Sequence, residues 1–391
     1  MLIKNGQIVL EKESIKGDIR IKGERIGEIS SSLIPLKGEE VIDAYGSFIM
    51  PGVVDLHTHG SGGYDFMDGD EDCVIKASQS LLYHGTTTCL PTSLTSSDED
   101  LFLFFENVRK AQKENKGAKI PGVHLEGPYF SDSMKGAQDT RFIITPTPSH
   151  YLSVMEKGCD LIKRWTIAPE LDGAMECIKY LNKEGVVISG GHTDGDYDTI
   201  SEAYDNGMTM LTHFYSGMST IKRVGGFRVL GAVEAGYLID KLFVELIADG
   251  MHLPPELLTM IFKMKVISYI TACSDSMRSA GMEDGPSILG PKNNGTDVII
   301  EGGIAKMPDR SCFAGSVATG ERLIKTLLGI MGMEPDKAAF ILSLNPSSII
   351  GLDKEIGSIA VGKYADLLVL DKDYEIKRVI LNGKTVRREE I

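Results

Sequence analysis

Eight short apolar runs, separated by segments with helical periodicity, constrain the fold of this 391-residue chain more than any other feature of its sequence. Each run is hydrophobic on both faces, as is typical of a parallel strand that is covered by helices on both sides. The intervening segments include residues 98–114, 198–206 and 254–264, which have the apolar spacing of helices. A strand and a helix that alternate eight times predict an α/β fold, a (β/α)8 TIM barrel. The runs expected to form its strands are 48–59, 87–91, 120–125, 165–169, 186–188, 208–211, 241–248 and 268–273.

Side chains that can bind a metal follow five of these runs. In a (β/α)8 barrel the catalytic groups lie at the carboxyl ends of the strands. His57 and His59 are two residues apart on the first run, so both imidazoles point to the same face and form one edge of a potential metal site. The residues of this kind at the ends of the other four runs are Glu126, His192, His213 and Asp275. Their placement predicts one shared site at one end of the barrel.

The remaining histidines are read differently. His252 starts the loop after the seventh run and is a further candidate for the site. His84 is expected at a helix end, His124 as a core histidine with its hydrogen bonds satisfied, and His150 in a surface loop.

The composition is that of a soluble enzyme with a small-molecule substrate. A net charge of -14 argues against nucleic acid and anionic membranes as partners. No apolar run approaches the length of a membrane span, and the N-terminus has a strand-and-turn pattern in place of a secretory leader. The six cysteines form no C-x-x-C pair, and several lie inside apolar runs. These features predict a cytoplasmic protein.

The two ends of the chain differ from its middle, because both consist of short strand patterns separated by turns. Neither end has enough strands to bury its own apolar face. We therefore expect residues 1–50 and 346–391 to form together a small β-sandwich beside a barrel of residues 51–345.

The motifs at the strand ends resemble those of the amidohydrolase superfamily. They are His57-Thr58-His59-Gly60, His124-Leu125-Glu126-Gly127-Pro128, Gly190-Gly191-His192-Thr193, Thr212-His213 and Ser274-Asp275. The closer resemblance, over residues 1–385, is to the N-acetylglucosamine-6-phosphate deacetylase family. It rests in addition on Ala168-Pro169-Glu170, Asp249-Gly250-Met251-His252 and Ala314-Gly315-Ser316. The resemblance implies a barrel with a flanking β-sandwich, usually as a homodimer, that hydrolyses the acetamide of an amino-sugar phosphate.

The ligand-type residues provide the chemistry that such a reaction needs. Glu126, His192 and His213 give a carboxylate and two imidazoles, a set that suits zinc with one open position, although iron accepts it as well. His57, His59 and Asp275 could complete a second metal site, so one or two ions are expected. Asp275 is expected to take a proton from the attacking water and deliver it to the leaving amine. The resemblance makes His252 a donor to the carbonyl or to a sugar hydroxyl.

The resemblance also indicates substrate-binding residues, and here the chain departs from the family pattern. The residues expected to contact the sugar phosphate are Ala137, Gln138, Ser216, Gly217, Arg223, His252, Phe313, Ala314 and Gly315. The family usually has His at the position of Gln138 and Asn-Ala at Ser216-Gly217. Arg228 is an alternative to Arg223 as the phosphate anchor. These departures leave open whether the substrate is N-acetylglucosamine 6-phosphate, its galactosamine epimer or an unphosphorylated sugar.

Two other functional classes are a cyclic-amide amidohydrolase and a non-catalytic binding protein. Cyclic-amide amidohydrolases usually carry a metal-bridging Lys at the end of the fourth strand, but here Lys163 comes too early and Glu126 takes the bridging role. A non-catalytic binding protein would be expected to have lost a ligand or Asp275, and none is lost. The sequence therefore favours the deacetylase.

Overall fold

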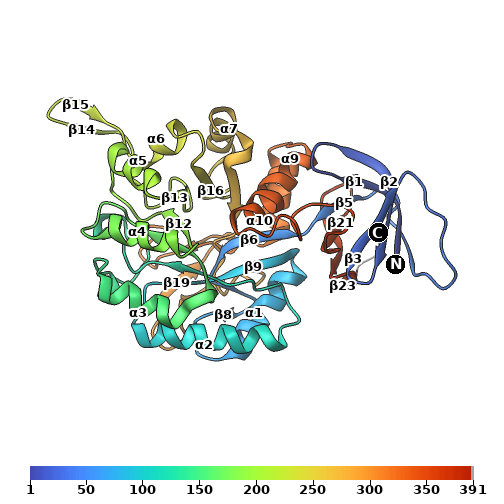
Figure 1. Cartoon of the computed structure of the whole chain (residues 1–391), viewed down its shortest axis with the longest axis horizontal. Coiled ribbons are helices and arrows are strands. Elements are labelled where there is room, and N and C mark those ends of the chain that lie inside the picture. Colours follow the sequence, from blue (N-terminus) through green and yellow to red (C-terminus); the bar gives the residue numbers. More distant parts are fainter. Residues whose placement is uncertain (389–391) are drawn as a thin grey trace.

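A parallel eight-stranded barrel forms the centre of the molecule in a computed structural model that describes residues 1–388 (Figure 1). Residues 389–391, the end of the expected terminal domain, lie outside the described residues. The chain order of the strands is also their order around the barrel, and the barrel closes between the last and the first strand, where the Asp275 amide donates to the His57 carbonyl at 2.9 Å. The strands are β6 (Val53–Thr58), β9 (Thr86–Ser93), β10 (Val123–Glu126), β11 (Ile162–Ile167), β12 (Val187–Gly190), β13 (Met208–Leu211), β16 (Phe243–Ile247) and β17 (Ile270–Cys273). Every one of them overlaps a predicted run, so the expected barrel is confirmed.

Helices cover the outside of the barrel and follow the predicted spacing. Helix α2 (Asp98–Glu114) begins and ends at the predicted residues, because Ser97 caps it by accepting from the Asp100 amide. Helices α5 (Tyr197–Asp205) and α7 (Pro255–Met264) lie within one residue of their predicted bounds. The other helices are α1 (Glu71–Tyr83), α3 (Pro148–Gly158), α4 (Ala174–Lys183), α6 (Ala232–Leu238), α8 (Gly320–Ile324), α9 (Pro335–Ala339) and α10 (Asn345–Ile349).

The expected role of His150 is wrong, because this residue lies in the first turn of α3. Its ring is held by the Tyr129 hydroxyl at 2.5 Å and by Asp98 at 2.9 Å. Pro148 is the first residue of α3. Proline is common at this position, because the missing N–H would have no partner within the helix. The expectation for His84, at the end of α1, is confirmed.

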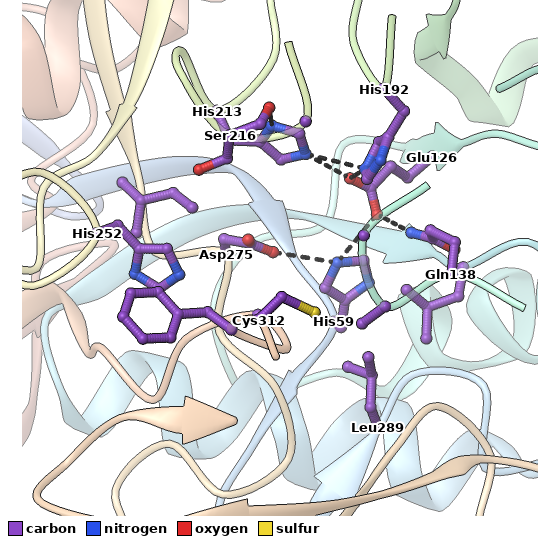
Figure 2. A pocket seen from close by; sticks show the side chains of 17 residues that line it. His59, Glu126, Gln138, His192, His213, Ser216, His252, Asp275, Leu289 and Cys312 are labelled. Carbon is purple, nitrogen blue, oxygen red and sulfur yellow. Dashed lines mark hydrogen bonds and ion pairs between the residues drawn. The ribbon is translucent and has the colours of Figure 1, made fainter. Parts of the chain in front are cut away.

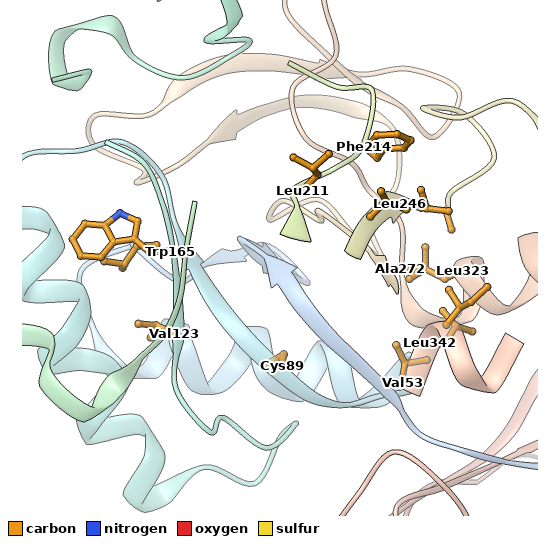
Figure 3. Packing of buried hydrophobic residues seen from close by; sticks show 14 of the residues in the cluster. Val53, Cys89, Val123, Trp165, Leu211, Phe214, Leu246, Ala272, Leu323 and Leu342 are labelled. Carbon is orange, nitrogen blue, oxygen red and sulfur yellow. The ribbon is translucent and has the colours of Figure 1, made fainter. Parts of the chain in front are cut away.

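The apolar faces of the barrel strands pack against the helices in one continuous core (Figure 3). Trp165 on β11 is fully buried there, and its indole N–H donates to the Gly127 carbonyl at 2.8 Å. Polar side chains on the same strands point instead to the barrel axis, so the strands carry both the core and the site. Among the described helices, none is long and apolar enough to cross a membrane.

Strands from both ends of the chain form one eight-stranded sheet beside the barrel (Figure 1). The strand β5 joins the two ends, because it pairs with β1 on one side and with β21 on the other. Isoleucines of both ends, such as Ile19, Ile49 and Ile380, share a separate core cluster. The sheet comprises β1 (Leu2–Val9), β2 (Ser14–Lys22), β3 (Arg25–Ser30), β4 (Val41–Asp43), β5 (Phe48–Pro51), β21 (Leu367–Leu370), β22 (Ile376–Leu381) and β23 (Lys384–Arg388). The boundaries at residues 50 and 346 stay a prediction.

Small additions to the barrel surround its carboxyl end. An antiparallel sheet of β18 (Gly285–Leu289), β19 (Thr296–Ile300) and β20 (Ala305–Lys306) follows the last barrel strand. A hairpin of β14 (Lys222–Val224) and β15 (Phe227–Val229) projects from the barrel near α5 and α6 (Figure 1). A two-stranded pair, β7 (Gly60–Ser61) and β8 (Tyr64–Asp65), follows the H-x-H motif.

Candidate metal centre and active site

The six residues expected to bind metal converge at the carboxyl end of the barrel, and all of them are buried. They divide into two sets whose ligand atoms lie within 4.8 Å of one another. We call Glu126, His192 and His213 the glutamate group, and His57, His59 and Asp275 the aspartate group. Figure 2 shows five of the six residues around the pocket.

In the glutamate group the ligand atoms of three strand ends meet. Glu126 Oε1 lies 3.3 Å from His192 Nε2 and 3.1 Å from His213 Nε2. The two imidazole nitrogens are themselves 3.1 Å apart. A carboxylate and two imidazoles that converge in this way offer a cation three ligands and leave room for a further one.

The aspartate group lies directly beside it. Asp275 Oδ1 lies 3.4 Å from His57 Nε2 and 3.2 Å from His59 Nε2. Glu126 joins the two groups, because its Oε1 is 3.3 Å from His57 Nε2 and its Oε2 is 3.4 Å from His59 Nε2. Glu126 therefore lies between the two groups and could offer a ligand atom to each.

Each imidazole presents Nε2 to the site and uses Nδ1 for a bond to the surrounding protein. The Nδ1 atoms of His59, His192 and His213 lie 3.2, 2.8 and 3.0 Å from the carbonyl oxygens of Thr92, Met134 and Ser216. A carbonyl can only accept, so Nδ1 must carry the proton, and Nε2 keeps its lone pair for a metal. Outer bonds of this kind accompany metal-binding histidines. The residues present therefore fit one or two divalent cations.

The electrostatics also favour a cation at this position. Burial opposes the charged form of His59, but its hydrogen bonds to Asp275 and Glu126 outweigh burial and raise its pKa to about 9. Burial would raise the pKa of Glu126, but the charge of His57 and the hydrogen bonds of the imidazoles hold it well below the usual range. The carboxylates of Glu126 and Asp275 thus keep their negative charge while buried. Protons on the imidazoles or bound metal ions must balance that charge.

Three of the ligand-type residues have left-handed backbone. The φ angles of His192, His213 and Asp275 are +47°, +32° and +48°. Such angles are rare for residues other than glycine and cost on the order of 1–3 kcal/mol each. Strain of this kind at three strand ends of one barrel supports the assignment of the place as a functional site.

A cavity of about 250 Å³ opens above the two groups. Most of the expected substrate residues line it, namely Ala137, Gln138, Ser216, Gly217, His252, Phe313 and Gly315. Ala314 does not line the cavity, because its side chain is buried behind it in the core of the β18–β20 sheet. Five lining residues were not among the expected site residues: Leu94, Gly136, Ile247, Leu289 and Cys312.

Gln138 is tied to the metal ligands. Its Nε2 donates to Glu126 Oε2 at 2.7 Å (Figure 2). Its Oε1 accepts from the amide and the hydroxyl of Thr95, both at 2.9 Å. These bonds use the carbonyl of Gln138 and one of its two N–H groups. Gln138 therefore holds Glu126 in place and has one N–H left for a ligand.

His252 lies on the opposite wall of the cavity (Figure 2). Its Nδ1 is 2.9 Å from Asp249 Oδ2, and its ring packs against Phe313. The Asp249 carboxylate accepts a hydrogen bond from Nδ1, and this bond fixes the orientation of the ring above the cavity.

Arg223 does not line the cavity of its own chain. It lies on the projecting β14–β15 hairpin, opposite Arg228, and both side chains are exposed. The hairpin extends away from the barrel (Figure 1). Neither arginine can therefore be assigned to the site from the geometry of one chain.

Two charged residues near the site were missed by the sequence reasoning. Arg164 on β11 and Glu245 on β16 are fully buried and form an ion pair inside the barrel. A charged residue within an otherwise apolar barrel strand was the signal that could have revealed them. His124, by contrast, is the satisfied core histidine that was expected, since its two nitrogens contact the Thr92 and Thr166 hydroxyls at 3.3 and 2.7 Å.

Comparison with known proteins agrees with this site. Residues 48–386 match the model of the amidohydrolase family. The chain is 32% identical to N-acetylglucosamine-6-phosphate deacetylase of Bacillus subtilis over 98% of this chain and 96% of that one. It is 27% identical to N-acetylgalactosamine-6-phosphate deacetylase of Escherichia coli O157:H7, over 86% of this chain and 87% of that one. A solved structure of a variant of the Mycobacterium smegmatis N-acetyl-D-glucosamine-6-phosphate deacetylase, in complex with N-acetyl-D-glucosamine-6-phosphate, has a TM-score of 0.90 and 29% identity and covers 99% of both chains. This chain belongs to the N-acetylglucosamine-6-phosphate deacetylase family of amidohydrolases.

Proposed function

We propose that this protein hydrolyses the acetamide of an N-acetylhexosamine 6-phosphate, with N-acetylglucosamine 6-phosphate as the first candidate, to the amine and acetate. One observation carries the proposal: Glu126 lies between two sets of ligand atoms, with Asp275 beside it, at the floor of an open cavity. This arrangement is suited to the hydrolysis of a linear amide.

The residues of the chain divide the work of the reaction. Glu126, His192 and His213 would hold a first cation, and His57, His59 and Asp275 a second. When bound, a divalent cation, zinc or iron, supplies a Lewis acid that polarises the acetamide carbonyl and lowers the pKa of water. The ligand set itself accepts either metal, and zinc is the first candidate.

Asp275 and His252 act on the reacting atoms. Asp275 accepts a proton from the attacking water and donates it to the amide nitrogen as the C–N bond breaks. In the metal-free site burial would raise the pKa of Asp275, but the charges of His57 and His59 hold it below the usual value. His252 turns Nε2 toward the substrate, because Nδ1 faces Asp249, and Nε2 forms a hydrogen bond with the acetamide carbonyl or with a sugar hydroxyl.

The phosphate needs a cation, because the protein carries a net charge of -14. Arg223 is the candidate, but it is exposed on a hairpin that leaves its own barrel. We therefore propose that the protein is a homodimer in which the β14–β15 hairpin of one subunit reaches the cavity of the other. The exposed Phe227 and Val224 on the same hairpin support this, because they would be buried in such an interface.

A second candidate substrate is N-acetylgalactosamine 6-phosphate. The observation in its favour is that Gln138 already forms hydrogen bonds with Glu126 and Thr95. Gln138 therefore offers the hexose fewer free hydrogen-bonding groups. We also propose a cytoplasmic location, because all six cysteines are free.

The test is steady-state turnover of purified protein on a panel of N-acetylated hexosamines, each with and without a 6-phosphate. We expect the highest kcat/KM for N-acetylglucosamine 6-phosphate. A higher kcat/KM for an unphosphorylated sugar would contradict the phosphate part of the proposal, and no turnover of any acetamide on the panel would contradict the reaction class.

A further inference from the structure

A buried ion pair lies directly behind His57, on the side away from the cavity. Glu245 Oε2 is 3.3 Å from His57 Nδ1, and both side chains are fully buried. Arg164 binds the same carboxylate, with Nη1 on Oε1 and with Nη2 2.8 Å from Oε2. Arg164, Glu245 and His57 therefore form one chain of contacts from the barrel axis to the aspartate group.

Other barrel residues hold Arg164 in this position. Its Nη2 also donates to the hydroxyls of Ser189 and Thr212 at 3.1 and 2.9 Å. A carboxylate inside a protein is costly unless a hydrogen-bonded partner balances it, and the two contacts of the guanidinium provide that balance. The guanidinium of Arg164 contacts both oxygens of the Glu245 carboxylate and balances its charge inside the barrel.

Glu245 is not itself placed to bind a metal. Glu245, His57 and Cys273 do offer three atoms within 4.8 Å of one another. However, the carboxylate oxygens already accept from Arg164, whose charge would repel a cation. Glu245 Oε2 accepts from the main-chain amide of His213 at 3.3 Å and from the ring of His57, so His57 is the metal ligand whose side chain it contacts.

This arrangement distinguishes His57 from the other three imidazoles of the two groups. Each of the others has a neutral main-chain carbonyl behind it, whereas His57 has a carboxylate. A charged acceptor fixes the proton on Nδ1, aims Nε2 at the site and makes Nε2 a stronger ligand. Because His57 belongs to the aspartate group, that gain falls on the second cation.

We propose that Glu245, held by Arg164, is a positioning residue that sets the affinity of the aspartate group for its cation, so that this buried pair decides whether the protein holds one metal or two. The inference rests on the metal-dependent function proposed above. It adds to that function a role for the buried Arg164–Glu245 pair, which would control the affinity of the second metal position.

The test is a metal titration of the full-length protein without substrate. Metal-free wild type and Glu245→Gln are each titrated with Co²⁺ at buffered free concentrations, and bound equivalents and the visible spectrum of the protein are recorded. We expect two equivalents in the wild type. In Glu245→Gln the first equivalent should bind as before, and the second should need roughly 10–100-fold more free metal, as is usual when an outer partner of a metal ligand is removed.

Two further variants separate positioning from folding. Glu106→Gln makes the same substitution on the exposed face of α2, away from Arg164 and His57, and should bind both equivalents like the wild type. If Glu245→Gln does not fold, because Arg164 is left unpaired, the double variant Arg164→Met, Glu245→Gln removes both buried charges and should still lose affinity for the second metal only.

Unchanged second-metal affinity in the folded Glu245 variants would overturn the inference, as would a wild type that saturates at one equivalent. Equal losses at both positions would overturn it too, because they would indicate a general structural effect. The titration needs no turnover, so it is independent of the sugar panel: a wild type that binds two ions but hydrolyses no acetamide would contradict the proposed function alone.

Discussion

Asp275 has two tasks at the scale of single residues, since it contacts the imidazoles of the aspartate group and is also the proposed proton carrier. Asp275→Asn keeps the shape of the side chain but removes the basic oxygen. We expect turnover to fall by about 10²–10⁴-fold, as for the loss of a general acid or base, while the glutamate group still binds metal and the protein still folds. The measurement is kcat on the best substrate of the panel, with metal content by elemental analysis. Near-normal turnover would mean that another group moves the proton.

Glu126 is the residue on which the metal assignment depends most, because its carboxylate contacts imidazoles of both groups. Glu126→Gln replaces a bridging anion by a neutral amide, and the cations would lose their shared ligand. We expect purified Glu126→Gln to contain less than one equivalent of metal, whereas the wild type contains at least one. Glu106→Gln, on the exposed face of α2, is the matched control and should keep the wild-type content. Full occupancy in Glu126→Gln would refute the assignment.

The sequence was sufficient to name the residues of both groups, because each follows an apolar strand and strand ends meet in a barrel. It could not give the contacts between them. The bond from Gln138 to Glu126 crosses from a loop to a strand end, and local pattern carries no information on such a pair. The left-handed backbone of His192, His213 and Asp275 could not be predicted from the sequence either, because residues other than glycine rarely adopt a positive φ.

At the scale of elements, two-sided apolar runs located all the barrel strands, and the apolar spacing of residues 98–114 predicted the bounds of α2 to the residue. The β18–β20 sheet was missed, because its strands are short and half exposed, and Gly, Pro and Asp interrupt their apolar pattern. The same sheet brings Leu289 to the cavity, so an unrecognised element accounts for an unrecognised lining residue.

Helix α7 ends at a buried lysine that should make stability depend on pH. Burial lowers the pKa of Lys265 to about 8, opposed by the charge of Asp240, and its ammonium donates to the Ile239 carbonyl at 2.7 Å. The unfolded chain would have the ordinary lysine pKa near 10.4. Below pH 8 the folded state carries the full cost of the buried charge. Between about pH 8 and 10.4 the unfolded state binds more protons, so stability rises with pH relative to a chain without this lysine.

The comparison is between wild type and Lys265→Met, each unfolded by heat at pH 7 and at pH 9.5. The lost bond to Ile239 affects the variant equally at both pH values, so only the titration of Lys265 changes the difference between the two proteins. We expect the stability of the wild type relative to the variant to increase by on the order of 1–3 kcal/mol at the higher pH. A difference that stays constant would show that Lys265 titrates normally.

At the scale of the whole molecule, both ends of the chain were expected to combine, and they do so in one sheet through β5. That expectation followed from the inability of either end to bury its apolar face alone. The relation between two copies of the chain could not be predicted in this way, because the polar hairpin sequence gives no sign of where it points. In the structure Arg223, the candidate phosphate anchor, is exposed on a hairpin outside its own barrel, so its partner cavity has to be sought in a second copy of the chain.

Arg223 supplies the test of the proposed dimer. A charge-assisted contact between a guanidinium and a phosphate is worth roughly 1.5–3 kcal/mol. Arg223→Ala should therefore raise KM for the phosphorylated sugar by about 10–150-fold and leave any activity on the unphosphorylated sugar almost untouched. Arg228→Ala, its neighbour across the hairpin, is the matched control. The reverse pattern would assign the phosphate to Arg228, and an unchanged KM in both would exclude the hairpin.

Mixed subunits then decide from which chain the arginine comes. Asp275→Asn has an intact hairpin but a disabled site, and Arg223→Ala has the opposite defects. If the arginine acts across the dimer, a hybrid of the two variants contains one complete site, formed by the Asp275 of one chain and the Arg223 of the other. Co-refolded or co-expressed variants should then recover low-KM activity that neither variant has alone. If the arginine acts within its own chain, every site in the hybrid lacks one of the two residues, and mixing should recover nothing.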